Sequence, residues 1–376
     1  MKLTKLLIIP AVVSSLSFTA CSDEPTTPRS ETEYIYDADA GGDIAGFYVL
    51  NEGNMGSNKC TLDYFDYNTK TYTRNIYAEM NPDQPLELGD SGYDIAVYNG
   101  RVYIVVTGSK KVEVLDATTT RRIGEVNIDA PRNLAFSGDY MYVSNFSGGE
   151  GSNGSVVKVK LDDLSIEGKC AVGMGPEEMV ITDGKLYVAN SSDYVNYDDK
   201  ISVIDLSTFT VTASIQCGVN MRCLRLDDFG NMWAVAQGNY NDIAGSLIML
   251  KKTNGEYAKS QEYDYACSRL AINSGTMYFY TTEYAADWST TVRYYKADIN
   301  ANGINGTPAP FLTDATANGI VGAYGIFVQP SNGTIFITDA VNYVSSGKIN
   351  CFDQSGKLLW KATTGDIPGH IAFVRK

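Results

Sequence analysis

Short apolar segments recur along most of the chain, separated by turns rich in Gly, Asn and Asp. In one recurring unit, an apolar strand precedes a Gly-containing turn and a second strand with an aromatic residue among apolar neighbours, as in GRVYIVV, GKLYVAN and GTIFITD. Short apolar segments bounded by turn residues are typical of β-strands. The unit recurs seven times, with its aromatic residue at Tyr48, Tyr103, Tyr142, Tyr187, Trp233, Tyr278 and Phe336. The pattern therefore indicates an internal repeat.

The length of the repeat and its further strands predict the fold. Tyr48 and Phe336 lie 288 residues apart, so the six intervals average 48 residues. In several units a third strand follows that ends in an apolar residue and Asp, as in VEVLDATT and ISVIDLST. A fourth strand comes after it, as in TVTASIQ and KLLWKAT. Four short strands in a repeat of this length are typical of a β-propeller blade. We therefore predict an all-β fold, a seven-bladed β-propeller.

The two ends of the repeat array predict how the ring closes. In six repeats a first strand starts nine to eleven residues before the aromatic residue, at Asp94, Asn133, Glu178, Cys223, Arg269 and Gly325. The repeat of Tyr48 has no such strand upstream, whereas the chain ends in PGHIAFV, which places His370 in the equivalent position. We expect this C-terminal strand to complete blade one, so that backbone hydrogen bonds join the first and last blades.

The residues before the repeats predict export and anchoring. Lys2 and Lys5 precede an apolar stretch and small residues, the pattern of a signal peptide over residues 1–20. The small residue before Cys21 resembles the lipobox of bacterial lipoproteins, which implies that Cys21 is lipidated and anchors the protein. A secreted protein in which Cys21 is incidental is the alternative.

The residues that follow Cys21 carry two further signals. The sequence SDE at 22–24 resembles the acidic tag that sends lipoproteins of Bacteroidetes to the outer cell surface. Residues 21–45 are rich in Pro, Thr, Asp and Gly, which predicts a lipidated flexible tether. The propeller is then expected to span residues 46–376. The resulting localisation is the cell outer membrane, with the protein lipid-anchored and exposed at the surface.

Composition narrows the possible functions. Hydrophobic residues make up 44% and charged residues 20% of the chain, values typical of a globular protein. The formal net charge is −14 and no basic run is present, which excludes nucleic acid as a partner. His370 is the single histidine, so a His-cluster metal site is excluded and a catalytic triad would depend on this one residue. The 26 tyrosines favour a binding surface, and we predict neither catalytic residues nor enzymatic activity.

Weak candidates for metal sites remain. Acidic residues in the linker, Asp37, Asp39 and Asp43, resemble a calcium loop but are better explained as solvated linker acids. DINANG from Asp298 resembles the start of an EF-hand loop, yet a simple turn is favoured because Ala309 occupies the position of the bidentate acid. Glu177 and Glu178 could hold a metal for lactonase-type hydrolysis, but no ring of acids supports this. We therefore predict no metal. Six cysteines are expected as buried free thiols: Cys60, Cys170, Cys217, Cys223, Cys267 and Cys351.

The connections between strands predict which face carries function. We call X the face with the loops after the second and fourth strands of each blade, and Y the opposite face. Y-side turns are short, such as Asn99-Gly100 and Asp183-Gly184, whereas X-side loops such as NFSGGEGSNG and NSSDYVNYDD are long. Two rings of residues at the starts of the first strands should line the mouth of the central channel on the X face. One ring is formed by the strand-start residues named above, and the other by the residue before each, namely Tyr93, Arg132, Glu177, Arg222, Ser268, Tyr324 and Gly369. Long, aromatic-rich loops on a rigid scaffold indicate a binding surface.

Several sequences resemble known families. LAFSGDYMYVSN, MVITDGKLYVANSS and ISVIDLSTFTV resemble the YncE-type propeller family. The lipobox, the segment FYVLNEGN and the Tyr-rich X face resemble more narrowly the BtuG-type cobalamin-binding surface lipoproteins of Bacteroidetes. The resemblance implies capture of cobalamin (vitamin B12) as a bound ligand, without a catalytic cofactor, and transfer to a TonB-dependent outer-membrane transporter. Alternatives are another ligand (glycan, haem or siderophore) and a protein–protein scaffold.

A ligand of this size needs a broad concavity with aromatic surfaces and with partners for its peripheral amides. The expected contact residues combine the mouth of the channel with the loops of the X face. They are Tyr93, Arg132, Asn145, Phe146, Tyr194, Tyr197, Arg222, Tyr240, Arg269, Tyr284, Trp288, Tyr324, Tyr343 and His370.

Overall fold

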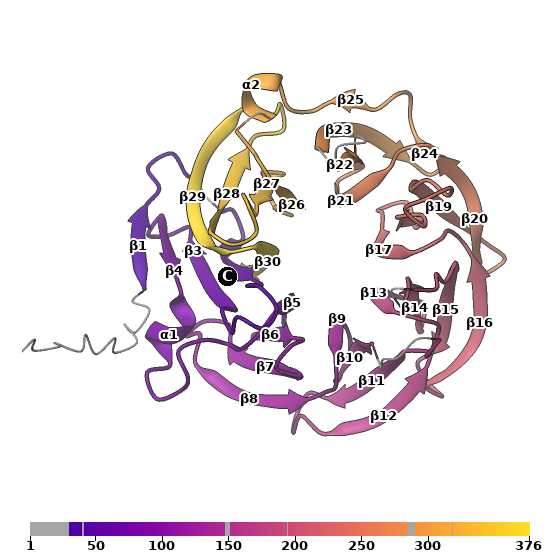
Figure 1. The fold of residues 1–376 in the computed structure, drawn as a ribbon, viewed down its shortest axis with the longest axis horizontal. Helices are drawn as coiled ribbons and strands as arrows, with labels where there is room; N and C mark the ends of the chain where they lie inside the picture. Colours follow the sequence, from indigo (N-terminus) through magenta and orange to yellow (C-terminus); the bar gives the residue numbers. More distant parts are fainter. Residues whose placement is uncertain (1–29, 40, 147–150, 194, 285–289, 318) are drawn as a thin grey trace, which may run out of the picture.

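Seven β-sheets surround a central axis in the computed structural model (Figure 1). The structure describes residues 30–376 except 40, 147–150, 194, 285–289 and 318. The described residues confirm the all-β, seven-bladed propeller, and each sheet forms one blade. The strands of each blade are antiparallel, and the first strand of each repeat lies innermost.

Blades one to four are built as follows, from the innermost strand outward. Blade one contains β30 (Pro368–Arg375), β2 (Ile44–Asn51), β3 (Thr61–Asp66), β4 (Thr71–Arg74) and β1 (Glu31–Tyr34). Blade two contains β5 (Gly92–Tyr98), β6 (Arg101–Val106), β7 (Lys111–Asp116) and β8 (Arg122–Asn127). Blade three contains β9 (Pro131–Ser137), β10 (Tyr140–Asn145), β11 (Ser155–Lys160) and β12 (Ile166–Ala171). Blade four contains β13 (Pro176–Thr182), β14 (Lys185–Asn190), β15 (Lys200–Asp205) and β16 (Thr210–Gln216).

Blades five to seven complete the ring. Blade five contains β17 (Met221–Leu226), β18 (Met232–Ala236), β19 (Ser246–Thr253) and β20 (Glu256–Tyr263). Blade six contains β21 (Cys267–Asn273), β22 (Thr276–Tyr284), β23 (Thr290–Asn300), β24 (Gly303–Ile304) and β25 (Ala309–Pro310). Blade seven contains β26 (Ala323–Val328), β27 (Ile335–Asp339), β28 (Ser346–Phe352) and β29 (Leu358–Asp366). The short helices α1 (Ile76–Met80) and α2 (Asp314–Ala317) lie in connections between blades.

The C-terminal strand closes the ring as predicted. β30 is the innermost strand of blade one and pairs antiparallel with β2, with His370 opposite Leu50 and Ile371 opposite Val49. Val49 and Leu50 are fully buried, so the junction is an apolar core as well as a hydrogen-bonded ladder. The two ends of the repeat array therefore share one sheet, and β30 covers the inner edge of β2.

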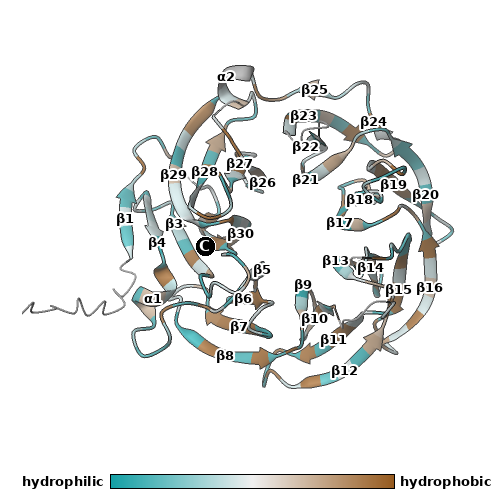
Figure 2. Cartoon of the chain, in the orientation of Figure 1, coloured by the Kyte–Doolittle hydropathy of each residue, from teal (hydrophilic) through white to brown (hydrophobic). Residues whose placement is uncertain are grey.

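Blade one begins earlier than the sequence predicted. β1 pairs with the outer strand β4, with Glu31 opposite Arg74, and Ile35, Ala38 and Ile44 are buried beyond it. The tether predicted over residues 21–45 is therefore too long, because β1, Ile35, Ala38 and Ile44 belong to blade one. All four residues of β1 are exposed and the strand is hydrophilic (Figure 2), so it gives no apolar signal and pairs through its backbone.

The second-strand aromatic residues form the core between blades. Each of the seven is at most 2% exposed. The Tyr48 hydroxyl of blade one lies 2.8 Å from the Thr120 hydroxyl beside blade two, and Trp233 Nε1 donates to Asp227 over 2.9 Å. The apolar clusters join residues of neighbouring blades, so packing between blades holds the ring together.

Turn chemistry on the Y face follows the sequence. Asn99 and Gly100 join β5 to β6 with φ values of 47° and 72°, the positive pair that a type I′ hairpin requires. The DINANG segment is also a turn, between β23 and β24, with Asn302 N–H donating to Asn300 Oδ1 over 2.8 Å. The six cysteines of the propeller are buried and unpaired. Within the described ranges, no helix is both long and apolar enough to cross a membrane.

Candidate ligand-binding face

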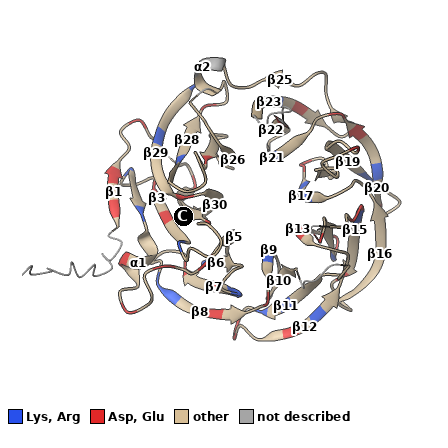
Figure 3. Cartoon of the chain, in the orientation of Figure 1, with Lys and Arg blue, Asp and Glu red and all other residues tan. Residues whose placement is uncertain are grey.

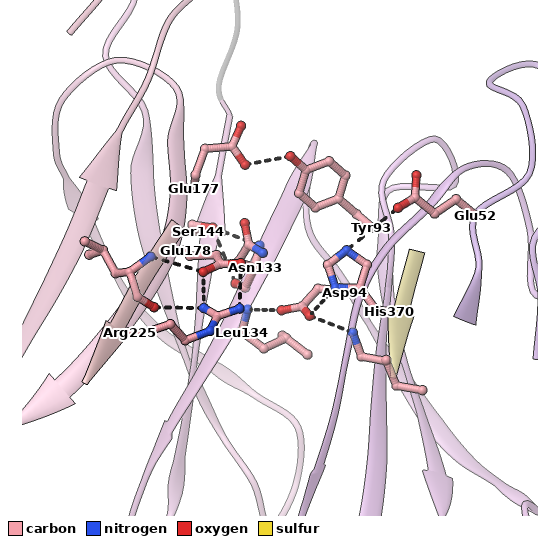
Figure 4. A network of polar contacts seen from close by, with 12 residues as sticks. Glu52, Tyr93, Asp94, Asn133, Leu134, Ser144, Glu177, Glu178, Arg225 and His370 are labelled. Carbon is pink, nitrogen blue, oxygen red and sulfur yellow. Dashed lines mark hydrogen bonds and ion pairs between the residues drawn. The ribbon is translucent and has the colours of Figure 1, made fainter. Parts of the chain in front are cut away.

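The innermost strands share a distortion that shapes the mouth of the channel. In every blade the register shifts near the first residues of the innermost strand, which holds one residue more than its partner there. In blade two, for example, Gly92 pairs with Val106 and Asp94 pairs with Val105, which leaves Tyr93 as the extra residue. A bulge re-aims side chains that would otherwise alternate between faces. It explains how two consecutive residues, Tyr93 and Asp94, both take part in the polar network of the channel (Figure 4).

Charged residues gather on the inner strands β9, β13 and β17 (Figure 3). Glu177 accepts a hydrogen bond from the Tyr93 hydroxyl over 2.6 Å and forms an ion pair of 2.7 Å with Arg132. The Arg132 guanidinium also lies over the Tyr93 ring, 4.1 Å from its centre, and 5.8 Å from the centre of the Phe146 ring. These contacts bring together residues of blades two, three and four.

A second ion pair lies beside the first. Arg225 binds both carboxylate oxygens of Glu178, and the Leu224 N–H donates to Glu178 Oε2 over 3.1 Å (Figure 4). Burial alone would raise the pKa of Glu178, but the Arg225 charge and its hydrogen bond outweigh it, so the pKa lies below its usual value. The carboxylates Glu177 and Glu178 are thus neutralised by separate arginines. Among the described residues, no three His, Cys, Asp or Glu side chains are grouped as metal ligands.

His370 lies between two carboxyl groups. Its Nδ1 is 3.5 Å from Asp94 Oδ1 and its Nε2 is 3.7 Å from Glu52 Oε1. Burial, with the nearby Arg269 charge, lowers the pKa of His370 to about 4, so the ring is neutral at pH 7. Burial raises the pKa of both Glu52 and Asp94 to about 7. A neutral imidazole has one donor and one acceptor nitrogen, and it can therefore satisfy both neighbours when one carboxyl group is protonated.

Two pockets lie side by side on the X face between blades five, six and seven. The larger, about 470 Å³, is lined by Tyr240 and Ile243 of the β18–β19 loop. The smaller, about 190 Å³, is lined by Arg269, Tyr324 and Tyr343. Gln237, Ser268 and Thr282 line both, so the two pockets form one hollow that leads from the rim to the channel mouth.

The structure brings part of the predicted contact set together. Tyr93, Arg132, Arg269, Tyr324 and His370 lie at the channel mouth, and Arg222 stands at the equivalent position of β17, within electrostatic reach of Tyr93. On the rim, Tyr240 is 67% and Tyr343 is 46% exposed, and the Tyr343 ring packs on Tyr324.

Other predicted residues lie elsewhere. Asn145 is buried and its Oδ1 accepts a hydrogen bond from Ser155 over 2.8 Å, so this residue supports the X-side loop and is not available to a ligand. Tyr197 is half-buried in a bridge to Ser192. Tyr194 and Trp288 lie outside the described residues, as does the side chain of Tyr284 at the end of β22.

Sequence reasoning missed three side chains of this region. Glu52, directly after β2, accepts a hydrogen bond from the Tyr324 hydroxyl over 2.7 Å. Arg225 holds Glu178, and Gln237 lines both pockets while its Nε2 donates to Cys267 O over 2.9 Å. Arg225 gave a signal, because Arg222 and Arg225 are the two charged residues of the inner strand MRCLRL, whose other residues are apolar.

Comparison with solved structures shows the fold alone, because the sequence identities are low. A quinonprotein alcohol dehydrogenase-like protein from Bacteroides thetaiotaomicron is 16% identical, with 88% of this chain and 79% of that chain covered at a TM-score of 0.64. A functionally unknown protein from Desulfotomaculum acetoxidans is 10% identical, covering 88% and 99%, with a TM-score of 0.62. The periplasmic gluconolactonase of Pseudomonas aeruginosa is 14% identical, covering 88% and 99%, with a TM-score of 0.60.

Comparison at the level of sequence identifies a family. A search of curated proteins finds no match. A family model matches residues 45–366, which run from the start of β2 to the end of β29 and so include nearly the whole propeller. The chain therefore belongs to the family described as a domain of unknown function, DUF5074.

Proposed function

We propose that this protein is a surface lipoprotein that captures cobalamin on its X face and hands it to a TonB-dependent outer-membrane transporter. The observation that carries the proposal is that exposed large apolar and aromatic side chains are more numerous on the X-side loops than on the Y-side turns, and that four of them line the hollow. Those on X-side loops are Met55, Val195, Tyr240, Ile243, Val321, Tyr343 and Val344, whereas Phe229 and Leu358 represent the Y face. Apolar patches of this kind mark binding surfaces.

The X-face hollow offers both kinds of contact that a corrinoid needs. Tyr240 and Tyr343 supply aromatic surface, and Gln237, Ser268 and Thr282 supply hydrogen-bonding groups for peripheral amides. The Y face also has a pocket, of about 450 Å³, but its lining includes Arg101, Asp139 and Lys160 and it lies among short turns. The X face therefore offers a ligand more apolar contact than the Y face does.

Rigidity supports tight capture. The inner strands are held by ladders within each blade and by packing between blades, so the groups at the channel mouth are ordered before a ligand arrives. Binding to an ordered site loses little conformational entropy. The sequence resemblance to BtuG-type lipoproteins supports cobalamin as the ligand, and the predicted anchor at Cys21 supports its capture at the cell surface.

In this proposal the protein binds its ligand and catalyses no reaction on it. Glu177 and Glu178, the carboxylates considered for a lactonase-type metal, are each bound by an arginine. A metal there would have to displace Arg132 and Arg225 and leave both cations without partners, which is unfavourable.

Calorimetry with cyanocobalamin and the purified propeller tests the proposal. We expect binding by the parent and a loss of about 1 kcal/mol or more for each of Tyr240→Ala and Tyr343→Ala, since exposed aromatic contacts at a site contribute this much. Tyr36→Ala is the matched control, because Tyr36 is 80% exposed and lies beyond β1 on the outside of blade one. Absence of binding by the parent would reject cobalamin and favour a glycan, haem, siderophore or protein partner. Binding that both rim variants retain would move the site off the X face.

A further inference from the structure

Two arginines at the mouth of the channel differ from the others. Arg132 and Arg225 pair with Glu177 and Glu178, but Arg222 and Arg269 form no ion pair within the described part of the chain. Arg222 is the bulged second residue of β17, and Arg269 is the third residue of the neighbouring inner strand β21.

The two cations belong to one region. β17 and β21 are the inner strands of adjacent blades, and both guanidinium groups interact electrostatically with Tyr93. The Arg269 side chain lines the smaller X-face pocket, where Nη1 donates to the backbone oxygen of Ser268 over 3.0 Å. Arg222 Nε is buried and has no hydrogen-bond partner in the described structure. A buried donor without an acceptor is unfavourable, so this position calls for an acceptor from outside the chain.

The nearby carboxyl groups are held by other partners and none of them bonds Arg222 Nε. Both oxygens of Glu177 are bound, by Arg132 and by the Tyr93 hydroxyl, and both oxygens of Glu178 are bound by Arg225. Glu52 accepts from the Tyr324 hydroxyl and contacts His370. These carboxyl oxygens therefore already have partners, while Arg269 lines the ligand hollow and Arg222 stands on the inner strand of the adjacent blade.

We propose that Arg222 and Arg269 form an anion subsite that binds a phosphate or carboxylate group of the ligand held on the X face. The proposal rests on the X face being the ligand site and adds the chemical class of one of the ligand's groups. A guanidinium presents parallel N–H donors that match the oxygens of a phosphate or a carboxylate, and charge-assisted bonds of this kind are strong. Ser268 and Thr282 line the hollow beside Arg269; the Ser268 hydroxyl donates to Thr282 Oγ1 over 2.9 Å, which leaves the Thr282 hydroxyl as a donor to the same group.

The protonation states of the neighbours agree with this arrangement. The Arg269 charge contributes, after burial, to the lowered pKa of His370, so the imidazole is neutral and does not add a third cation at pH 7. Burial raises the pKa of Glu52 and Asp94 to about 7, so these acids carry only part of their negative charge at neutral pH. Both effects leave the arginines as the dominant charges toward an incoming anion.

Two corrinoids separate the subsite from the rest of the binding surface. Cyanocobalamin carries a phosphodiester, and dicyanocobinamide has the same ring without the phosphodiester, ribose and base. We expect Arg222→Gln and Arg269→Gln to weaken cyanocobalamin binding about tenfold or more. Binding of dicyanocobinamide should stay nearly unchanged, because in a double-mutant cycle only a direct interaction between the side chain and the phosphate gives such a difference. Arg222→Lys should restore part of the affinity because it keeps the charge. Arg121→Gln, at an exposed position between β7 and β8, controls for the change in net charge.

The results distinguish this proposal from the proposed function. Suppose that the parent binds cyanocobalamin and that the Gln substitutions weaken the binding of both corrinoids equally, or of neither. The anion subsite is then wrong, while cobalamin capture stands. If the parent binds neither corrinoid, cobalamin is rejected, and the subsite is tested with inorganic phosphate at constant ionic strength. Phosphate should then raise the melting temperature of the parent and of Arg121→Gln but not of Arg222→Gln, and equal shifts in all three would overturn it. Far-ultraviolet circular dichroism checks that each variant is folded.

Discussion

Glu52→Gln should make the stability of the protein less dependent on pH. The Glu52 carboxyl group is enclosed in the channel, with 13% of its side chain exposed, and contacts the Tyr324 hydroxyl at 2.7 Å and His370 Nε2 at 3.7 Å. Burial raises its pKa from 4.5 to about 7, although Tyr324 and Arg269 oppose the shift. The folded state therefore binds the proton more tightly than the unfolded state does.

The sign and size of this pH dependence follow from the linkage between proton binding and folding. A carboxyl group with a raised pKa contributes stability fully below the unfolded pKa of 4.5 and loses it as pH rises through about 7. At 1.36 kcal/mol per pKa unit, the loss of stability approaches about 3 kcal/mol by pH 8. Asp94 contributes to this loss, because the two acids are coupled through His370. Gln keeps an acceptor for Tyr324 and has no charge to bury. The variant should thus match the parent near pH 5 and exceed it by about 2–3 kcal/mol at pH 8.

Urea unfolding followed by tryptophan fluorescence at pH 5, 6, 7 and 8 measures the effect. Glu79→Gln is the control, because Glu79 is an exposed acid of α1 away from the channel. A difference between variant and parent that stays constant from pH 5 to pH 8 would refute the reasoning. Lower stability of Glu52→Gln at pH 8 would show that the fold stabilises the Glu52 carboxylate, which would contradict a raised pKa.

Three further changes test the fold and the anchor. Deleting residues 367–376 removes β30, exposes β2 and part of the core, and should abolish cooperative unfolding; an unchanged melting curve would contradict the closure. Trp233→Ala should lower the free energy of unfolding by about 3–5 kcal/mol, because Trp233 is fully buried and bonded to Asp227, and urea titration checks it. If Cys21 carries the lipid, Cys21→Ala should release the protein from the outer membrane, and protease added to intact parent cells should digest the propeller; protection of the propeller would contradict surface exposure.

The sequence predicted what repeated side-chain patterning controls. An aromatic residue that recurs in the second strand of each repeat must be buried in each, and Tyr48, Trp233 and Phe336 are all at most 1% exposed. Closure by β30 followed from counting strands at the two ends of the array. The extra strand β1 escaped because none of its four side chains is buried, so only its backbone pairing with β4 reveals it.

Residues at the channel mouth were predicted in part because their positions repeat as well. The starts of the inner strands gave two rings of consecutive residues, and the bulge in each blade makes such neighbours available to the same region. The prediction failed for Asn145, whose place at the end of β10 suggested a rim residue. Its side chain turns inward to Ser155, a choice that hydrogen bonding decides and strand position does not.

One residue missed at the mouth, Glu52, occupies a place that the rings leave empty. Gly369 and Gly325 stand at ring positions without side chains, and a Cβ atom on Gly369 would collide with the Glu52 carboxyl group. A Cβ atom on Gly325 would likewise meet the Phe327 ring, which lines the channel beside His370. Each glycine thus admits a side chain from a neighbouring position, and the identity of that side chain depends on packing in three dimensions. A ring position occupied by glycine therefore indicates that another residue fills the space, and at Gly369 that residue is Glu52, which brings a titratable group to the channel mouth.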